Sequence, residues 1–134
     1  MTYQELDSAD DLSYTVPTKL NETARKRSFL NGAAMSAGFT VWADDSAGSP
    51  KDIYFVTTAA ATIVAALPTV ASGDASLGRT VTIMKIDAGA GSVTIDPDGS
   101  ETINGAATVS LASQYHYRTL MYDGATGWIV ISSS

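Results

Sequence analysis

The sequence predicts an all-β fold, an antiparallel β-sandwich or small barrel of successive hairpins that follows a mostly irregular N-terminal arm. Threonine alternates with valine and isoleucine in segments such as RTVTIMKI (79–86), and this period of two is typical of half-buried strands. Turn pairs rich in aspartate, asparagine and glycine separate these segments every eight to twelve residues. Short alternating segments joined by tight turns therefore indicate neighbouring antiparallel strands.

Residues 1–50 form the expected arm, because they show no strand pattern. Pro17 interrupts regular structure early in this segment. The stretch KLNETARKRSFLNG (19–32) is a candidate for a short helix, although its apolar residues make only a weak stripe. The segment WADDSAGSPK (42–51) predicts a loop or linker at the start of the β domain, residues 51–134.

Eight strands are expected in this β domain. They cover residues 53–57, 61–67, 79–86, 92–95, 101–103, 107–112, 115–122 and 127–132. Alanine, glycine, serine and threonine are heavily used, so one copy of the chain would have a thin hydrophobic core. A thin core favours further burial between subunits.

Composition excludes several functional classes. The 134 residues contain no cysteine, which excludes disulfides, thiolate metal sites and cysteine nucleophiles. A net charge of -6, with one basic run at 25–27, argues against nucleic acid as a partner, because binding phosphates needs many cations. The longest apolar run, 59–66, is too short to span a membrane. The acidic start MTYQELDSADD is unlike a signal peptide, so we expect synthesis in the cytoplasm.

The acidic stretch VTIDPDGSETINGAATVSL (93–111) suggests a calcium site as one interpretation, with Asp96, Asp98 and Glu101 as ligands. An EF-hand loop needs glycine at its sixth position and glutamate at its twelfth, and neither residue is there. Turn chemistry explains the acids better. The DG pair at 98–99 suits a tight turn, and the NG pair at 104–105 is the favoured type I′ hairpin pair. We therefore expect no metal site.

No set of residues predicts an enzyme. His116 is the only histidine, and no pattern of serine and carboxylate around it indicates a catalytic triad. Tyr115, Tyr117, Tyr122 and Trp128 form an aromatic group near the C-terminus, and Tyr115, Tyr117 and Trp128 are its candidate contact residues. Such rings are typical of a core or a subunit contact, and they are also suited to stacking on a sugar. We expect no catalytic residue and no cofactor.

The order of sequence words in the β domain resembles a module of tailed-bacteriophage virion proteins, found in tail fibres, head fibres and capsid decoration proteins. The matching words are Leu-Pro at 67–68, GRTVTIMK at 78–85, VTIDPDGSETINGA at 93–106 and YDGATGW at 122–128. This resemblance implies a non-enzymatic β domain on the virion, commonly a homotrimer. It implies no catalytic or ligand-binding residue.

A short chain of this kind is predicted to be a trimeric capsid decoration (cement) protein that binds the major capsid protein or another virion protein through its N-terminal arm. Candidate contact residues in the arm are Glu5, Asp7, Arg25, Lys26 and Arg27. One alternative is a short tail or head fibre, or a fibre adaptor. The other is a carbohydrate-binding module, in which Tyr115, Tyr117 and Trp128 would bind a glycan. A carbohydrate-cleaving enzyme ranks last, because no paired carboxylates face each other.

Overall fold

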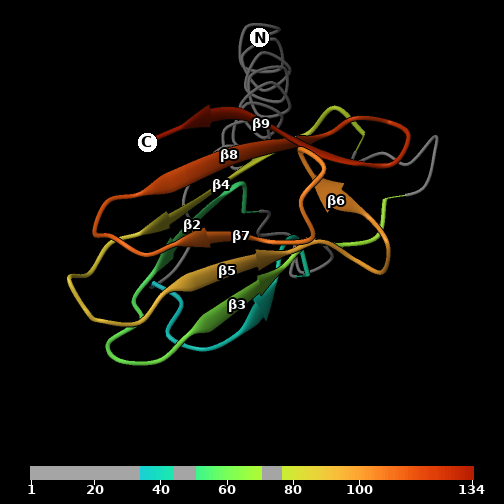
Figure 1. Cartoon of the computed structure of the whole chain (residues 1–134). Coiled ribbons are helices and arrows are strands. Elements are labelled where there is room, and N and C mark those ends of the chain that lie inside the picture. Colours follow the sequence, from blue (N-terminus) through green and yellow to red (C-terminus); the bar gives the residue numbers. More distant parts are fainter. Residues whose placement is uncertain (1–33, 44–50, 71–76) are drawn as a thin grey trace, which may run out of the picture.

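The computed structural model describes residues 34–43, 51–70 and 77–134, and these residues form two packed β-sheets without a helix (Figure 1). One sheet has the strand order β1 (Phe39–Thr40), β3 (Ile63–Ala66), β5 (Val93–Asp96), β7 (Val109–Leu111). The other has the order β2 (Ile53–Val56), β4 (Thr80–Lys85), β8 (Tyr117–Tyr122), β9 (Gly127–Ser133), β6 (Thr102–Ile103). The all-β prediction is confirmed, and each of the eight expected strands is present with ends that differ by two residues or fewer.

The sheets are mixed, so the expectation of successive antiparallel hairpins is wrong. From β1 to β8 the chain alternates between the two sheets, and strands two apart therefore become neighbours. The pairs β1–β3, β2–β4 and β3–β5 are parallel, as is β6–β9. Among the described strands, only β8 and β9 form a hairpin of consecutive strands in one sheet. A parallel pair needs a crossover, and for β1–β3, β2–β4 and β3–β5 the intervening strand in the opposite sheet provides it, as in the coils of a β-solenoid.

The hydrophobic core lies between the two sheets and follows the alternation of the sequence. In β4, Val81 and Ile83 are fully buried while Thr80 and Thr82 lie on the other face. In β5, Val93 and Ile95 are fully buried. Side chains from both sheets thus meet in one layer, which is the usual core of a β-sandwich.

Residues 34–43 belong to the β domain, although we expected it to begin at residue 51. Met35 pairs with β2: its N–H donates to the Phe55 carbonyl (2.7 Å), and its carbonyl accepts from the Thr57 N–H (2.9 Å). Val41 and Trp42 are both buried in the core. The helix considered at 19–32 and most of the expected loop at 42–51 lie outside the described residues.

Candidate functional site

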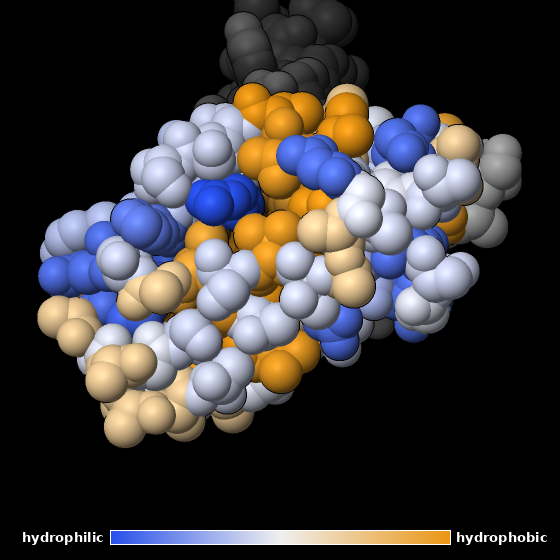
Figure 2. All heavy atoms as spheres, in the orientation of Figure 1, coloured by the Kyte–Doolittle hydropathy of each residue, from blue (hydrophilic) through white to orange (hydrophobic). Residues whose placement is uncertain are grey.

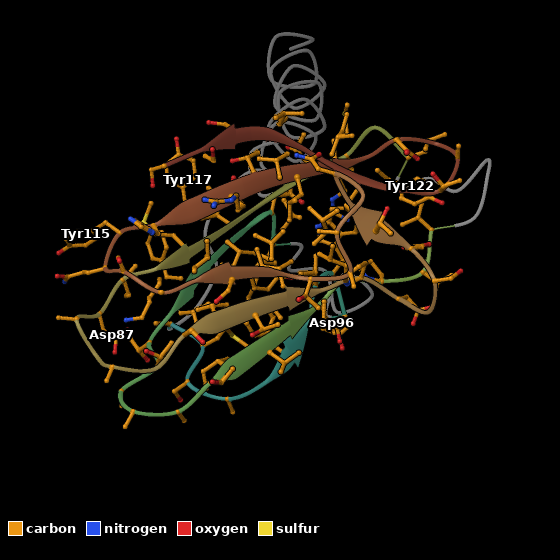
Figure 3. The ribbon with its side chains drawn as sticks, in the orientation of Figure 1. Asp87, Asp96, Tyr115, Tyr117 and Tyr122 are labelled. Carbon is orange, nitrogen blue, oxygen red and sulfur yellow. The ribbon has the colours of Figure 1, made fainter. Side chains whose placement is uncertain are left out.

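The three candidate aromatics near the C-terminus do not share a surface. Trp128 is only 1% exposed, whereas Tyr115 is 62% exposed and Tyr117 is half-buried. Trp128 pairs with Tyr122, which is five residues along β8 from Tyr117. At about 3.3 Å per residue, this separation is roughly 16 Å. Figure 3 shows Tyr117 and Tyr122 toward opposite ends of the strand. A sugar-stacking platform that includes Trp128 is therefore wrong.

Trp128 is a core residue whose polar atom has a partner. Its ring packs edge-on against Tyr122, with centroids 5.6 Å apart, and is tilted against Trp42 at 5.9 Å. Its indole Nε1–H donates to the Glu101 carboxylate at 3.0 Å. This hydrogen bond explains how a tryptophan is tolerated at full burial, and it gives Glu101 a structural role.

Tyr115 is presented to solvent on a fixed turn. Its N–H donates to the Lys85 carbonyl (2.7 Å), and its own carbonyl accepts from Ser134 Oγ (3.3 Å). Its φ of 65° lies in the left-handed region, which costs a tyrosine about 1–2 kcal/mol. Tyr117, next to it at the start of β8, bonds through its hydroxyl to Ser132 Oγ (3.1 Å). Tyr115 is thus the described aromatic best placed to contact a partner.

The turns expected within 93–111 are present, whereas the carboxylates of Asp98 and Glu101 bond to side chains far along the chain. Gly99 has a φ of 56°, and the Glu101 N–H donates to the Asp98 carbonyl at 3.0 Å across that turn. Asn104 and Gly105 both have positive φ, at 50° and 83°, which is the type I′ geometry. The Asp98 carboxylate accepts from the Thr69 hydroxyl. In the part of the chain that the structure describes, no group of three or more histidine, aspartate or glutamate side chains is arranged to hold a metal ion.

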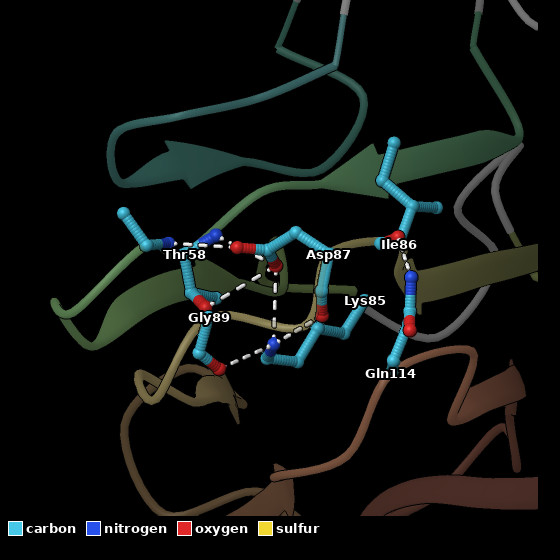
Figure 4. A network of polar contacts seen from close by, with 7 residues as sticks. Thr58, Lys85, Ile86, Asp87, Gly89 and Gln114 are labelled. Atoms are coloured by element: carbon cyan, nitrogen blue, oxygen red, sulfur yellow. Dashed lines mark hydrogen bonds and ion pairs between the residues drawn. The ribbon is translucent and has the colours of Figure 1, made fainter.

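A polar network around Lys85 was not predicted from the sequence (Figure 4). Lys85 ends β4 on its inner face and is fully buried. Its Nζ donates to the Asp87 carbonyl (2.6 Å), to the Gly89 carbonyl (2.9 Å) and to Asp87 Oδ1 (3.1 Å). The alternation TVTIMK already places this lysine on the face of Val81 and Ile83. That position was the one signal in the sequence for the network.

Asp87 connects the Lys85 network to the loop that follows β2. Its carboxylate accepts from the Thr58 N–H (3.0 Å), the Ala59 N–H (2.8 Å) and the Thr58 hydroxyl (3.3 Å). The pKa of Asp87 lies well below its usual range, mainly because its carboxylate accepts the hydrogen bond from the Thr58 N–H. Ala59 and Lys85 also lower this pKa, whereas partial desolvation raises it.

Glycine lets these two loops approach closely. A Cβ on Gly89 would overlap the Ala59 carbonyl, and one on Gly91 would overlap the Ala61 carbonyl. The Gly91 N–H donates to the Ala59 carbonyl at 3.0 Å. Because Lys85 is enclosed by its own acceptors beneath these loops, it is not placed to act as a nucleophile. The network therefore holds the loops 58–61 and 87–91 together and has a structural role.

His116 and Arg118 are polar residues near the C-terminus that lie outside the Lys85 network. His116 is exposed, and its ring bonds to no described residue. Arg118 donates to the carbonyls of Tyr117 (2.8 Å) and Ser134 (2.9 Å) and makes no ion pair with a described residue. Neither residue stands beside a nucleophile or a carboxylate in an arrangement typical of a catalytic site.

The proposed arm contacts lie outside the described residues. They are Glu5, Asp7, Arg25, Lys26 and Arg27, so the structure does not place any of them. Within the described residues, no helix is long and apolar enough to cross a membrane. No protein-family model and no curated protein matches the chain.

Proposed function

We propose that this chain is a structural protein of a tailed-bacteriophage virion, and specifically a trimeric capsid decoration protein. The observation that carries the proposal is the series of sequence words from Leu67 to Trp128 that resembles virion β modules. The small two-sheet domain is compatible with that role, because many unrelated binding surfaces can be built on one fold of this kind.

In this proposal the N-terminal segment attaches the domain to the major capsid protein. Glu5, Asp7, Arg25, Lys26 and Arg27 supply charges of both signs for that contact. Because β1, Val41 and Trp42 are part of the folded domain, an informative truncation removes residues 1–33 and keeps Ala34 onward. Removal of residues 1–50 would instead take part of the core away.

The experiment combines binding and copy number. Purified full-length chain and the variant without residues 1–33 are mixed with capsids of the encoding phage that lack the chain, and co-sedimentation is measured. We expect the full chain to sediment with the capsids at many copies per capsid. The truncated chain should be folded by circular dichroism but remain in the supernatant. Equal attachment of both forms would refute the role of the arm.

Copy number in the intact virion separates this function from the alternative. A decoration protein covers the capsid lattice, whereas a fibre or adaptor is present at few copies at one vertex or on the tail. Quantitative mass spectrometry of virions, with antibody labelling in electron micrographs, measures both number and place. A few copies on the tail would refute the decoration role in favour of the fibre.

A further inference from the structure

Residues 103–106 form a tight hairpin around an asparagine–glycine pair. The Ile103 N–H donates to the Ala106 carbonyl (2.8 Å), and the Ala106 N–H donates to the Ile103 carbonyl (2.9 Å). Asn104 and Gly105 are both exposed at its tip. An asparagine followed by glycine is chemically labile, because glycine has no side chain to hinder attack by its backbone nitrogen on the asparagine amide. The hairpin therefore presents a candidate modification site to solvent.

The reaction open to this pair is deamidation through a cyclic imide. The Gly105 nitrogen attacks Asn104 Cγ, so that a new N–Cγ bond replaces the bond from Cγ to the amide nitrogen. That nitrogen leaves as ammonia and takes up the proton that Gly105 loses. Water then opens the ring at one of its two carbonyls and leaves either aspartate or isoaspartate at position 104. The reaction consumes one water and adds one carboxyl group, which is ionised at neutral pH.

The native turn keeps the reacting atoms apart. Ring closure needs the Gly105 nitrogen and the Asn104 Cβ on the same side of the Asn104 Cα–C bond. The φ values of 50° and 83° are those of a type I′ turn. In such a turn the first central residue has a ψ of about 30°, which places its Cβ roughly 150° from the next nitrogen about that bond. The Asn104 amide is also held against β9, because its Oδ1 accepts from the Val130 N–H at 3.1 Å. The ring therefore cannot close while the hairpin is formed.

Opening of the hairpin breaks more than its two internal hydrogen bonds. The Asn104 N–H also donates to the Trp128 carbonyl at 2.9 Å, and Ile103 is fully buried. In Figure 2, polar residues lie beside strongly hydrophobic ones over the part of the surface where β6 and β9 meet, so opening there exposes apolar surface. We propose that Asn104 is a deamidation site whose rate is set by opening of the hairpin 103–106. Modification at this residue then records local unfolding at the edge of the five-stranded sheet.

The two products differ in their effect on the fold. Aspartate at position 104 keeps the backbone, and its carboxylate accepts from the Val130 N–H in a charge-assisted hydrogen bond. Isoaspartate adds a methylene group to the main chain, and a two-residue type I′ loop has no room for it. The pairing of β6 with β9, which joins Ile103 to Trp128, depends on that loop. Conversion to isoaspartate should therefore release β6 from the sheet.

The test compares the full chain with a synthetic peptide of residues 100–109, which has the same local sequence without the fold. Both are incubated at mildly alkaline pH, and mass spectrometry follows the conversion of amide to acid. In the full chain the tryptic peptide 86–118 contains Asn104 as its only asparagine, and the other asparagine–glycine pair, at 31–32, falls in a different peptide. We expect conversion at Asn104 to be at least about tenfold slower in the full chain, since each of the four hydrogen bonds named above favours the closed hairpin by about 2–12-fold.

Ala106→Pro opens the hairpin selectively. It removes the Ala106 N–H and disfavours the conformation of the preceding Gly105, while the exposed Ala106 side chain has no core contact to lose. Ala106→Ser keeps the N–H and is the matched control, and each variant is compared with its own peptide. We expect conversion at Asn104 to be several-fold faster in Ala106→Pro and unchanged in Ala106→Ser.

Urea below the concentration that unfolds the full chain replaces Ala106→Pro if circular dichroism shows that this variant does not fold, and it should give the same increase. Equal rates in the folded chain and the peptide would overturn the proposal. So would a rate that does not rise in folded Ala106→Pro or in urea, or the absence of conversion at Asn104 in the fully unfolded chain.

Discussion

Replacement of Lys85 by methionine should destabilise the domain by about 3 kcal/mol, because a buried acceptor left without its donor costs ~1–3 kcal/mol. Lys85 Nζ satisfies the carbonyls of Asp87 and Gly89 and one carboxylate oxygen of Asp87. Methionine fills a similar volume, so the lost hydrogen bonds dominate over any cavity. The Asp87 carboxylate keeps its bonds from Thr58 and Ala59, which limits the cost.

The assay is chemical denaturation followed by circular dichroism, together with thermal unfolding. A loss of about 3 kcal/mol corresponds to a Tm lower by roughly 10–15 °C for a domain of this size. Ser110→Met is the control, because Ser110 is exposed in β7 and should change stability by less than about 0.5 kcal/mol. If the free energy of unfolding of Lys85→Met were within 1 kcal/mol of that of the unchanged chain, the hydrogen bonds of Lys85 would not be what holds the two loops together.

Three further results are expected. Because the pKa of Asp87 is lowered by folding, its carboxylate stabilises the fold above about pH 4, and this stabilisation is lost as the pH falls through the pKa of the folded state. Asp87→Asn should therefore make the free energy of unfolding, measured by denaturation, depend less on pH in the acid range. Gly91→Ala should cost several kcal/mol, seen as a lower Tm, because the new methyl group overlaps the Ala61 carbonyl; a change below 1 kcal/mol would contradict this close approach. Tyr115→Gly should leave stability unchanged or raise it by about 1 kcal/mol in the same assay, because glycine relieves the positive φ, and a large loss would show that the exposed ring is needed for folding.

Local chemistry along the chain was enough to place eight of the nine described strands, β1 being the exception, and several of the turns between them. Alternation put Val81 and Ile83 in the core, and the pair Asn104-Gly105 adopts the positive φ values that its type of turn requires. The same local reasoning placed the turns within 93–111, which depend on neighbours in sequence. The partners of the Asp98 and Glu101 carboxylates, Thr69 and Trp128, lie far along the chain and were not predicted.

Strand partners depended on contacts between residues far apart in the chain. A turn signal shows where one strand ends, but the next strand can pair in the same sheet or cross to the other, and the alternation of side chains is the same in both cases. Here it crosses nearly every time, which makes several pairs parallel. The inclusion of Val41 and Trp42 in the core has a similar cause, because their partners lie across the sandwich.

The residues of the candidate site could likewise be predicted only in part from the sequence. The sequence identified Tyr115, Tyr117 and Trp128 as one aromatic group, yet only the hairpin geometry shows Trp128 buried against Tyr122 and bonded to Glu101. Its burial depends on long-range packing, which sequence spacing does not encode. Likewise, the cross-strand neighbours in β2, β4, β8 and β9 follow only from the register of these strands, since their residues are scattered from 53 to 133 along the chain.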